Sequence, residues 1–156
     1  MNIIISEVCL KDPAIAGKKA AMLATLDAAG FNVPPFFVIA SEALISGLID
    51  GELQQAIAAA VAGISGREQH VAVRSSSVEE DGIETSFAGQ FESFLDVPQE
   101  EICEYAMKVS ASAQSDHINA YRESTGQAGP VDAPAVMVQR MVNASTAGVA
   151  FAADPV

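Results

Sequence analysis

The sequence is poor in basic residues and in cysteine. Eight lysines and arginines stand against twenty aspartates and glutamates, which gives a formal net charge of −12. This deficit argues against a surface for nucleic acid or for an anionic membrane, because both need clustered cations. The two cysteines, Cys9 and Cys103, are too few and too far apart for a disulfide framework or a zinc set. They are predicted to be small buried hydrophobes.

Long apolar runs and targeting signals are also missing. No run approaches the roughly 18–20 residues of a membrane span. The opening MNIIISEVCLKD has no basic region, and Glu7 comes early, so it does not resemble a secretory signal. With 156 residues, half of them apolar, the chain is long enough for one domain with its own core. We expect a soluble, cytoplasmic domain.

Helical and strand-like patterns follow one another irregularly. An alanine-rich stretch begins near Gly17 and stops at Gly30, and Ser41 is a good N-cap for a later helix. The predicted helices cover about 17–30, 41–49, 52–62 and 99–124, the last either continuous or broken near Ser115; the predicted strands cover 36–40, 70–75, 91–97, 135–142 and 148–153. This order predicts an α+β, or mixed α/β, domain and not a regular doubly wound sheet.

Two lysines, Lys18 and Lys19, fall in the first turn of the first long helix. Cations are unfavourable there, because the helix dipole places partial positive charge at that end. Their position makes sense if an anion docks nearby and meets both the free N–H groups and the ammonium groups. The alternative is two solvated lysines near Asp12.

Arg74 follows the apolar residues VAV and is predicted to project from the end of a buried strand. Arginine suits such a place if its forked guanidinium clamps a phosphate or a carboxylate. The alternative is an ion pair with the acidic residues at 79–81. The three serines after Arg74 have no partnered base, so they do not indicate a nucleophile.

Two further segments could contact a ligand. Gly89, in the small-residue loop SFAGQ, permits close approach of the backbone, although an ordinary hairpin loop would look the same. The segment VMVQRMV at 136–142 could pack on an adenine ring, or it could be plain sheet core with a polar edge. His70 and His117 stand alone, and no spacing suggests a metal site.

Taken together, four blocks resemble the N-terminal nucleotide-binding domain of phosphoenolpyruvate synthase and pyruvate phosphate dikinase. That domain resembles the ATP-grasp fold and is shared with rifampicin phosphotransferase. The blocks are AGKKAAML with VPPFFVI after it, VAVRSSSVEEDGIETSFAGQFESFLDV, INAYRESTG, and VMVQRMV with AGVAFAADP. The second block is the most specific, because R-S-S, a Glu-Asp pair and S-F-A-G-Q follow one another at the family's ungapped spacing.

The resemblance implies roles for individual residues. Lys18 would bind phosphate, and Arg74 would hold the transferring phosphates and act as the catalytic residue. Gly89 and Ser93 would contact the nucleotide. The segment that opens at Gln139 and includes Met141 and Val142 would form the adenine hinge. Lys19 departs from the family, which usually has glycine or asparagine there, and the stretch between Lys18 and Arg74 is short.

The resemblance also implies partners and cofactors. The family's magnesium-binding carboxylates lie beyond the D-P motif, here Asp154 and Pro155, so we expect residues 1–156 to be the N-terminal part of a truncated ATP-binding domain. The complete protein would bind ATP with Mg2+, pass a phosphoryl group to a histidine in a phosphohistidine domain, and then phosphorylate pyruvate to phosphoenolpyruvate. This piece alone would be inactive.

Two alternatives stay open. The chain could belong to a rifampicin phosphotransferase-like enzyme or to another dikinase. It could also be a non-catalytic regulatory or interaction module that has kept the fold.

Overall fold

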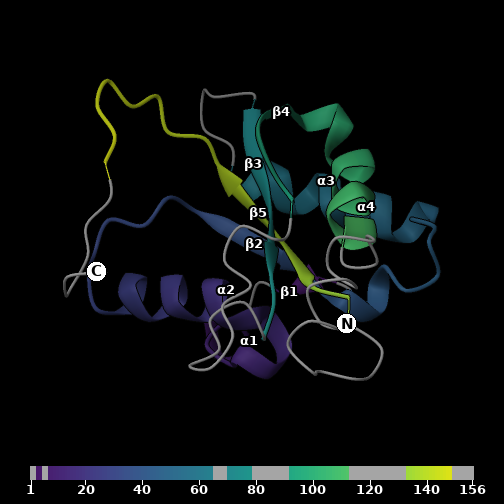
Figure 1. Cartoon of the computed structure of the whole chain (residues 1–156), viewed down its shortest axis with the longest axis horizontal. Helices are drawn as coiled ribbons and strands as arrows, with labels where there is room; N and C mark the ends of the chain where they lie inside the picture. Colours follow the sequence, from purple (N-terminus) through teal and green to yellow (C-terminus); the bar gives the residue numbers. More distant parts are fainter. Residues whose placement is uncertain (1–2, 5–6, 65–69, 79–91, 113–132, 149–156) are drawn as a thin grey trace, which may run out of the picture.

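A computed structural model describes residues 3–4, 7–64, 70–78, 92–112 and 133–148. Five strands form one sheet in the order β1-β2-β5-β3-β4, and every neighbouring pair is antiparallel (Figure 1). The strands are β1 (Ile3–Ile4), β2 (Phe36–Ile39), β3 (His70–Ser76), β4 (Ser93–Pro98) and β5 (Ala135–Arg140). Among the described strands, the one that comes last along the chain, β5, therefore lies in the middle of the sheet. The described part confirms a mixed α/β fold.

Helices cover both faces of this sheet (Figure 1). Helices α3 (Gly51–Ile64) and α4 (Ile102–Ser112) pack on one face, where alternate residues of β2, β3 and β5 point into a large aliphatic core. Helix α2 (Pro13–Ala28) packs on the other face, against Val38, Ala40, Ala135 and Met137. A short helix, α1 (Glu7–Leu10), precedes α2. We call these the α3/α4 face and the α2 face.

Helix α2 is bent near its start. Asp12 caps its first N–H groups, with Oδ1 accepting from the N–H of Ala14 at 2.9 Å, and Pro13 occupies the first turn, where its missing N–H costs nothing. Gly17 then leaves the helical conformation, with φ 78° and ψ 161°, and the helix resumes at Lys18. The predicted start near Gly17 therefore marks the second and longer piece of α2.

The helix predicted over 41–49 is wrong. Only a single 3-10 turn, η1 (Ser41–Ala43), forms there, and its N-cap residue is Ala40, not Ser41. The chain instead turns at Gly47, with φ 71°. The next predicted helix is confirmed as α3, where Asp50 Oδ1 accepts from the N–H of Leu53 at 2.8 Å.

Alternation along the strand predicted over 91–97 places Phe91, Ser93, Leu95 and Val97 on one face and Glu92, Phe94 and Asp96 on the other, and this prediction is wrong. Strict alternation would put Phe94 and Val97 on opposite faces, yet both contact the core under α3 and α4. The cause is an irregularity in the β3–β4 register between Val71 and Val73, together with Asp96 in the left-handed region at φ 59°. Leu95 is left exposed.

The sequence patterns did not predict β1 or α1. The helix expected over 99–124 is present as the turn η2 (Gln99–Glu101) and α4, and the rest of that prediction lies outside the described residues. So do the polar loop beyond Val78 and the strand predicted over 148–153, apart from Gly148. Among the described helices, none has the length and apolar character needed to cross a membrane.

Candidate functional site

The second piece of α2 begins directly against the end of β3. The N–H of Lys18 donates to the carbonyl of Ser77 at 3.1 Å, and the N–H of Ala20 donates to Ser76 Oγ at 3.1 Å. A Cβ on Gly17 would lie 2.0 Å from the carbonyl oxygen of Ser76. Two otherwise orphaned helix N–H groups are therefore satisfied by the last residue of β3 and the residue after it, more than fifty positions away in sequence.

The two lysines of this turn have different surroundings. Lys19 reaches down to the strand, where its Nζ donates to the carbonyl of Ser75 at 2.9 Å. Lys18 is half-buried and lines a surface pocket of about 520 Å³ beside Lys19, Met22 and Thr25. Two cations in the first turn of a helix were predicted to be unfavourable, and the bond to Ser75 offsets that cost for Lys19.

Arg74 lies on the α2 face of the sheet. It is directly opposite Met137 of β5 and Ser93 of β4, and residues opposite one another in antiparallel strands share a face. Its Nε is buried and has no hydrogen-bond partner among the residues that the structure describes. A buried guanidinium nitrogen costs free energy until an acceptor reaches it, so this position favours an anionic partner.

The acidic residues that could pair with Arg74, at 79–81, lie outside the described residues, as does Gly89. Ser93 is exposed and is the last residue of β4 to pair with β3 at this end, opposite Arg74. The strand pairing therefore brings two of the predicted site residues side by side on one face.

The segment predicted to be an adenine hinge begins at the other end of β5. Gln139 is buried on the α2 face, and its Nε2 donates to the carbonyl of Pro34 at 3.1 Å. The N–H groups of Arg140 and Met141 donate to the carbonyls of Pro35 and His70, at 3.0 and 3.4 Å. Val142 comes next and is exposed. The N–H groups of Arg140 and Met141 are therefore already bonded within the protein. Backbone recognition of a base edge at this segment would have to use its carbonyl groups or the residues from Val142 onward.

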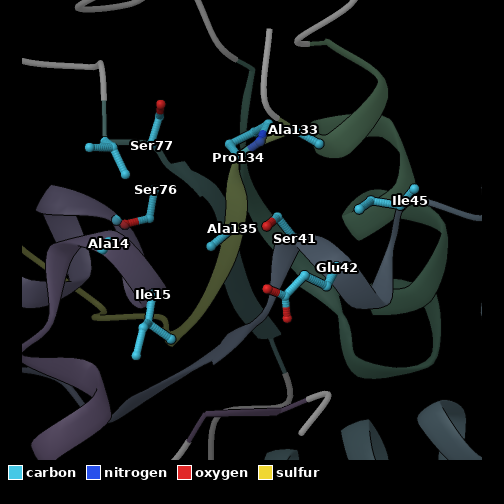
Figure 2. A pocket seen from close by; sticks show the side chains of 12 residues that line it. Ala14, Ile15, Ser41, Glu42, Ile45, Ser76, Ser77, Ala133, Pro134 and Ala135 are labelled. Atoms are coloured by element: carbon cyan, nitrogen blue, oxygen red, sulfur yellow. The ribbon is translucent and has the colours of Figure 1, made fainter. Parts of the chain in front are cut away.

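A second pocket, of about 470 Å³, is lined in part by Ala14, Ile15 and Gly17 of α2, and Figure 2 shows it from close by. Ser41 and Glu42 face it from η1, and Ser76 and Ser77 from the end of β3. Its described lining contains hydroxyl groups and one carboxylate but no lysine or arginine. A phosphate group does not fit such a lining, because the Glu42 carboxylate would repel it.

The described residues show no metal centre. No group of three or more histidine, cysteine, aspartate or glutamate side chains among them could hold a metal ion. The cysteines were predicted to be buried, but each is only half-buried where it packs against one of the two cores. Burial raises the pKa of the Cys103 thiol above its ordinary value. His70 is paired with Asp96 at 2.8 Å on the surface.

Sequence reasoning missed the parts of this site that carry no charge. The Gly17 conformation and the Ser76 hydroxyl fix the start of the Lys18 helix on β3. A local signal existed for Gly17, because glycine directly before a helix pattern favours a bend. Ser76 gave no such signal, since its partner at Ala20 is 56 residues away.

Comparison with known proteins identifies relatives of the whole chain. The profile of the family described as "Pyruvate phosphate dikinase, AMP/ATP-binding domain" matches residues 44–156. That range includes Arg74, Ser93 and Gln139, and Lys18 precedes it.

Individual relatives cover the Lys18 segment as well. A probable phosphoenolpyruvate synthase of Methanocaldococcus jannaschii is 31% identical over 196 residues, with 97% of this chain covered and 16% of that protein. The uncharacterized phosphotransferase YvkC of Bacillus subtilis is 32% identical, with 91% and 20% covered. The prodigiosin synthesizing transferase PigC of Serratia marcescens is 31% identical, with 92% and 19% covered. The chain thus spans at most a fifth of the length of these relatives.

Proposed function

The chain belongs to the family of pyruvate phosphate dikinase AMP/ATP-binding domains, and from this premise we propose that it is the ATP-binding part of a phosphotransferase similar to phosphoenolpyruvate synthase. In the complete protein, a phosphoryl group of ATP passes to a histidine of another domain and then to pyruvate. The observation that supports this most directly is the buried Arg74 Nε, which lacks an acceptor among the described residues.

Arg74 and Lys18 hold the phosphates in this proposal. Arg74 keeps its charge at any physiological pH and offers several donors in a fixed fork, which suits phosphate oxygens. Lys18 adds a compact positive charge from the start of the second piece of α2. Phosphoryl transfer needs such positioning and charge neutralisation more than it needs covalent help from the protein.

The base and the loop complete the proposed site. Gln139, Met141 and Val142 lie along the adenine, with Met141 and Val142 as apolar contacts. Ser93 stands beside Arg74 at the end of β4, and Gly89 lets the loop before it approach the nucleotide. The assignment to the ATP-grasp fold belongs to the same proposal and is supported by the family and by the antiparallel sheet with a lysine-bearing helix on one face.

Magnesium has no set of ligands in the described part of the chain. ATP would carry Mg2+ into such a site, where the metal would help to neutralise the charge of the phosphates. Its carboxylate ligands are proposed to come from the complete protein, beyond Asp154. On this basis the 156-residue chain binds ATP but hydrolyses it negligibly.

A second candidate differs in the phosphoryl acceptor. The identity to the prodigiosin synthesizing transferase PigC, 31% over 170 residues, equals the identity to the M. jannaschii synthase. A transferase that takes part in the synthesis of another product is therefore a second candidate, supported by this relative. A non-catalytic module has no specific observation in its favour.

Calorimetric titration of the chain with Mg-ATP tests the proposal. Arg74→Gln is expected to weaken binding by about tenfold or more, because a hydrogen bond to a charged group contributes roughly 1.5–3 kcal/mol. Lys108→Met is the matched control, since it removes one positive charge from α4, under the opposite face of the sheet. Equal affinity of wild type and Arg74→Gln would contradict the assignment, and so would appreciable hydrolysis of ATP by the chain alone.

A further inference from the structure

Lys19 stands where the resembled family usually has glycine or asparagine, and its side chain has a specific partner. Its Nζ donates to the main-chain carbonyl of Ser75 at 2.9 Å. Ser75 directly follows Arg74, and the β3–β4 register ends at the pair of Arg74 and Ser93. The ammonium therefore binds the main chain of β3 just beyond the place where β4 stops pairing with it.

Two more hydrogen bonds join the same turn to the same strand. The Lys18 N–H donates to Ser77, and the Ala20 N–H donates to Ser76. Three consecutive residues of α2 thus bond to three consecutive residues of the chain, of which Ser75 and Ser76 end β3 and Ser77 directly follows it. The bond from Lys19 is the only one of these three in which a charged side chain takes part, and hydrogen bonds of charged groups are about twice as strong as neutral ones.

We propose that Lys19 is a positioning residue, whose bond to the Ser75 carbonyl fixes the Lys18 turn of α2 against the strand that presents Arg74. Lys18 and Arg74 come from segments 56 residues apart, and a phosphate chain can contact both only if that separation in space is held constant. Lys19 fixes this separation because its side chain is hydrogen-bonded to Ser75, the residue next to Arg74. The expected effect of Lys19 on ATP affinity rests on the proposed function, whereas the hydrogen bond between Lys19 and Ser75 does not depend on it.

The alternative role for Lys19 is a direct one, as a second cation for phosphate. Its ammonium is already committed to a carbonyl of the protein, which leaves it in a fixed place and reduces its freedom to follow a ligand. A positioning role predicts that any side chain able to donate to Ser75 from this site suffices. A direct charge role predicts that loss of the positive charge weakens ATP binding even when the position of the Lys18 turn is unchanged.

Hydrogen exchange of single amides, measured by NMR without nucleotide, tests whether the bond from Lys19 to Ser75 holds the Lys18 turn against β3. In Lys19→Met the amides of Lys18 and Ala20 are expected to exchange about tenfold faster, while the amide of Ala24, deeper in α2, keeps its rate. Lys19→Arg, which can still donate to Ser75, is expected to restore the slow rates. Unchanged rates in Lys19→Met would overturn the proposal, and so would a loss of protection through all of α2, which would mean a general loss of stability.

Titration with Mg-ATP completes the test. Lys19→Met is expected to weaken binding about fivefold, and Lys19→Arg is expected to bind like the wild type, with Lys108→Met as the charge control. If Lys19→Met exchanged faster but bound ATP with unchanged affinity, the proposed role of Lys19 in positioning the phosphate site would be overturned. Slow exchange with weakened affinity would overturn it in favour of a direct charge role. Failure of the wild type to bind ATP would count against the proposed function, and the exchange rates would still decide whether Lys19 holds the Lys18 turn against β3.

Discussion

The two faces of the sheet are built from different kinds of residue. Large branched and aromatic side chains fill the α3/α4 face, among them Phe37, Ile39 and Ile102, all almost fully buried. On the α2 face the helix contributes small residues, Ala16, Ala20 and Ala24. The α2 face also carries the polar residues Arg74, Ser76 and Gln139.

Because the two faces bury different kinds of side chain, substitutions on them are expected to have different effects. Burial of apolar area stabilises a fold by roughly 25 cal/mol per Å², so the bulky α3/α4 face supplies most of the hydrophobic stabilisation. Alanines bury little area, but they let the helix backbone approach the sheet closely enough for Lys18, Lys19 and Ala20 to bond to β3. We therefore expect the largest changes in the free energy of unfolding from substitutions on the first face, and smaller changes from substitutions on the second, where single contacts between the Lys18 turn and β3 are lost.

The largest effect is expected from Phe37→Ala. Phe37 is 1% exposed in the α3/α4 core, and truncating a buried phenylalanine costs about 3–5 kcal/mol. Urea denaturation measures the change in the free energy of unfolding, with Phe31→Ala, at an exposed site, as the control that should alter it little. A loss from Phe37→Ala as small as that from Phe31→Ala would break the comparison of the two faces.

Gly17→Ala is expected to have the next largest effect. A non-glycine residue in this backbone region costs roughly 1–3 kcal/mol, and the new Cβ would also meet the Ser76 carbonyl at 2.0 Å. Gly30→Ala is the matched control, because Gly30 also has positive φ, 87°, but nothing lies within 4 Å of its Cβ position. Denaturation and amide exchange of Lys18 should show a larger change for Gly17→Ala. Equal changes would mean that close approach to β3 does not matter.

Ser76→Ala is expected to cost about 1 kcal/mol in the free energy of unfolding, because the buried Ala20 N–H loses its acceptor. The control is Ser46→Ala, which removes the same kind of bond, from the N–H of Leu48, at an exposed turn where water replaces it. Urea denaturation of both variants checks the difference. A cost for Ser46→Ala that equals or exceeds that for Ser76→Ala would contradict the role given to the α2 face.

The smallest effect concerns Cys103 and pH. Burial raises the pKa of its thiol above the ordinary 9.0 in the folded state. A group with a raised folded pKa contributes stability that is present below its unfolded pKa and is lost as pH rises through the folded one. Wild type should therefore lose slightly more stability than Cys103→Ala when denaturation is repeated at increasing pH above 9. Parallel losses would show that the α3/α4 core does not exclude the thiolate.

Local patterns along the sequence were sufficient for much of the fold. Helix propensity and glycine stops predicted α2 and α3, and apolar runs predicted β2, β3 and β5, since these elements depend on residues close in sequence. The family blocks pointed to the phosphotransferase family and to Arg74 as a candidate. The prediction of a helix over 41–49 was wrong because one good cap residue does not stabilise a helix. The prediction of strict alternation in β4 was wrong because the register shift between β3 and β4 depends on the partner strand.

Tertiary structure alone decided how the candidate site is held together. The central place of β5 puts Met137 opposite Arg74 and lays α2 across the same face. The bonds from the Lys18 turn to residues 75–77 join segments more than fifty positions apart, and no periodicity or local propensity encodes a contact over such a distance. The sequence determined which residues are available for a phosphate site, and packing of α2 on the sheet decided where those on β3 and on the helix lie relative to one another.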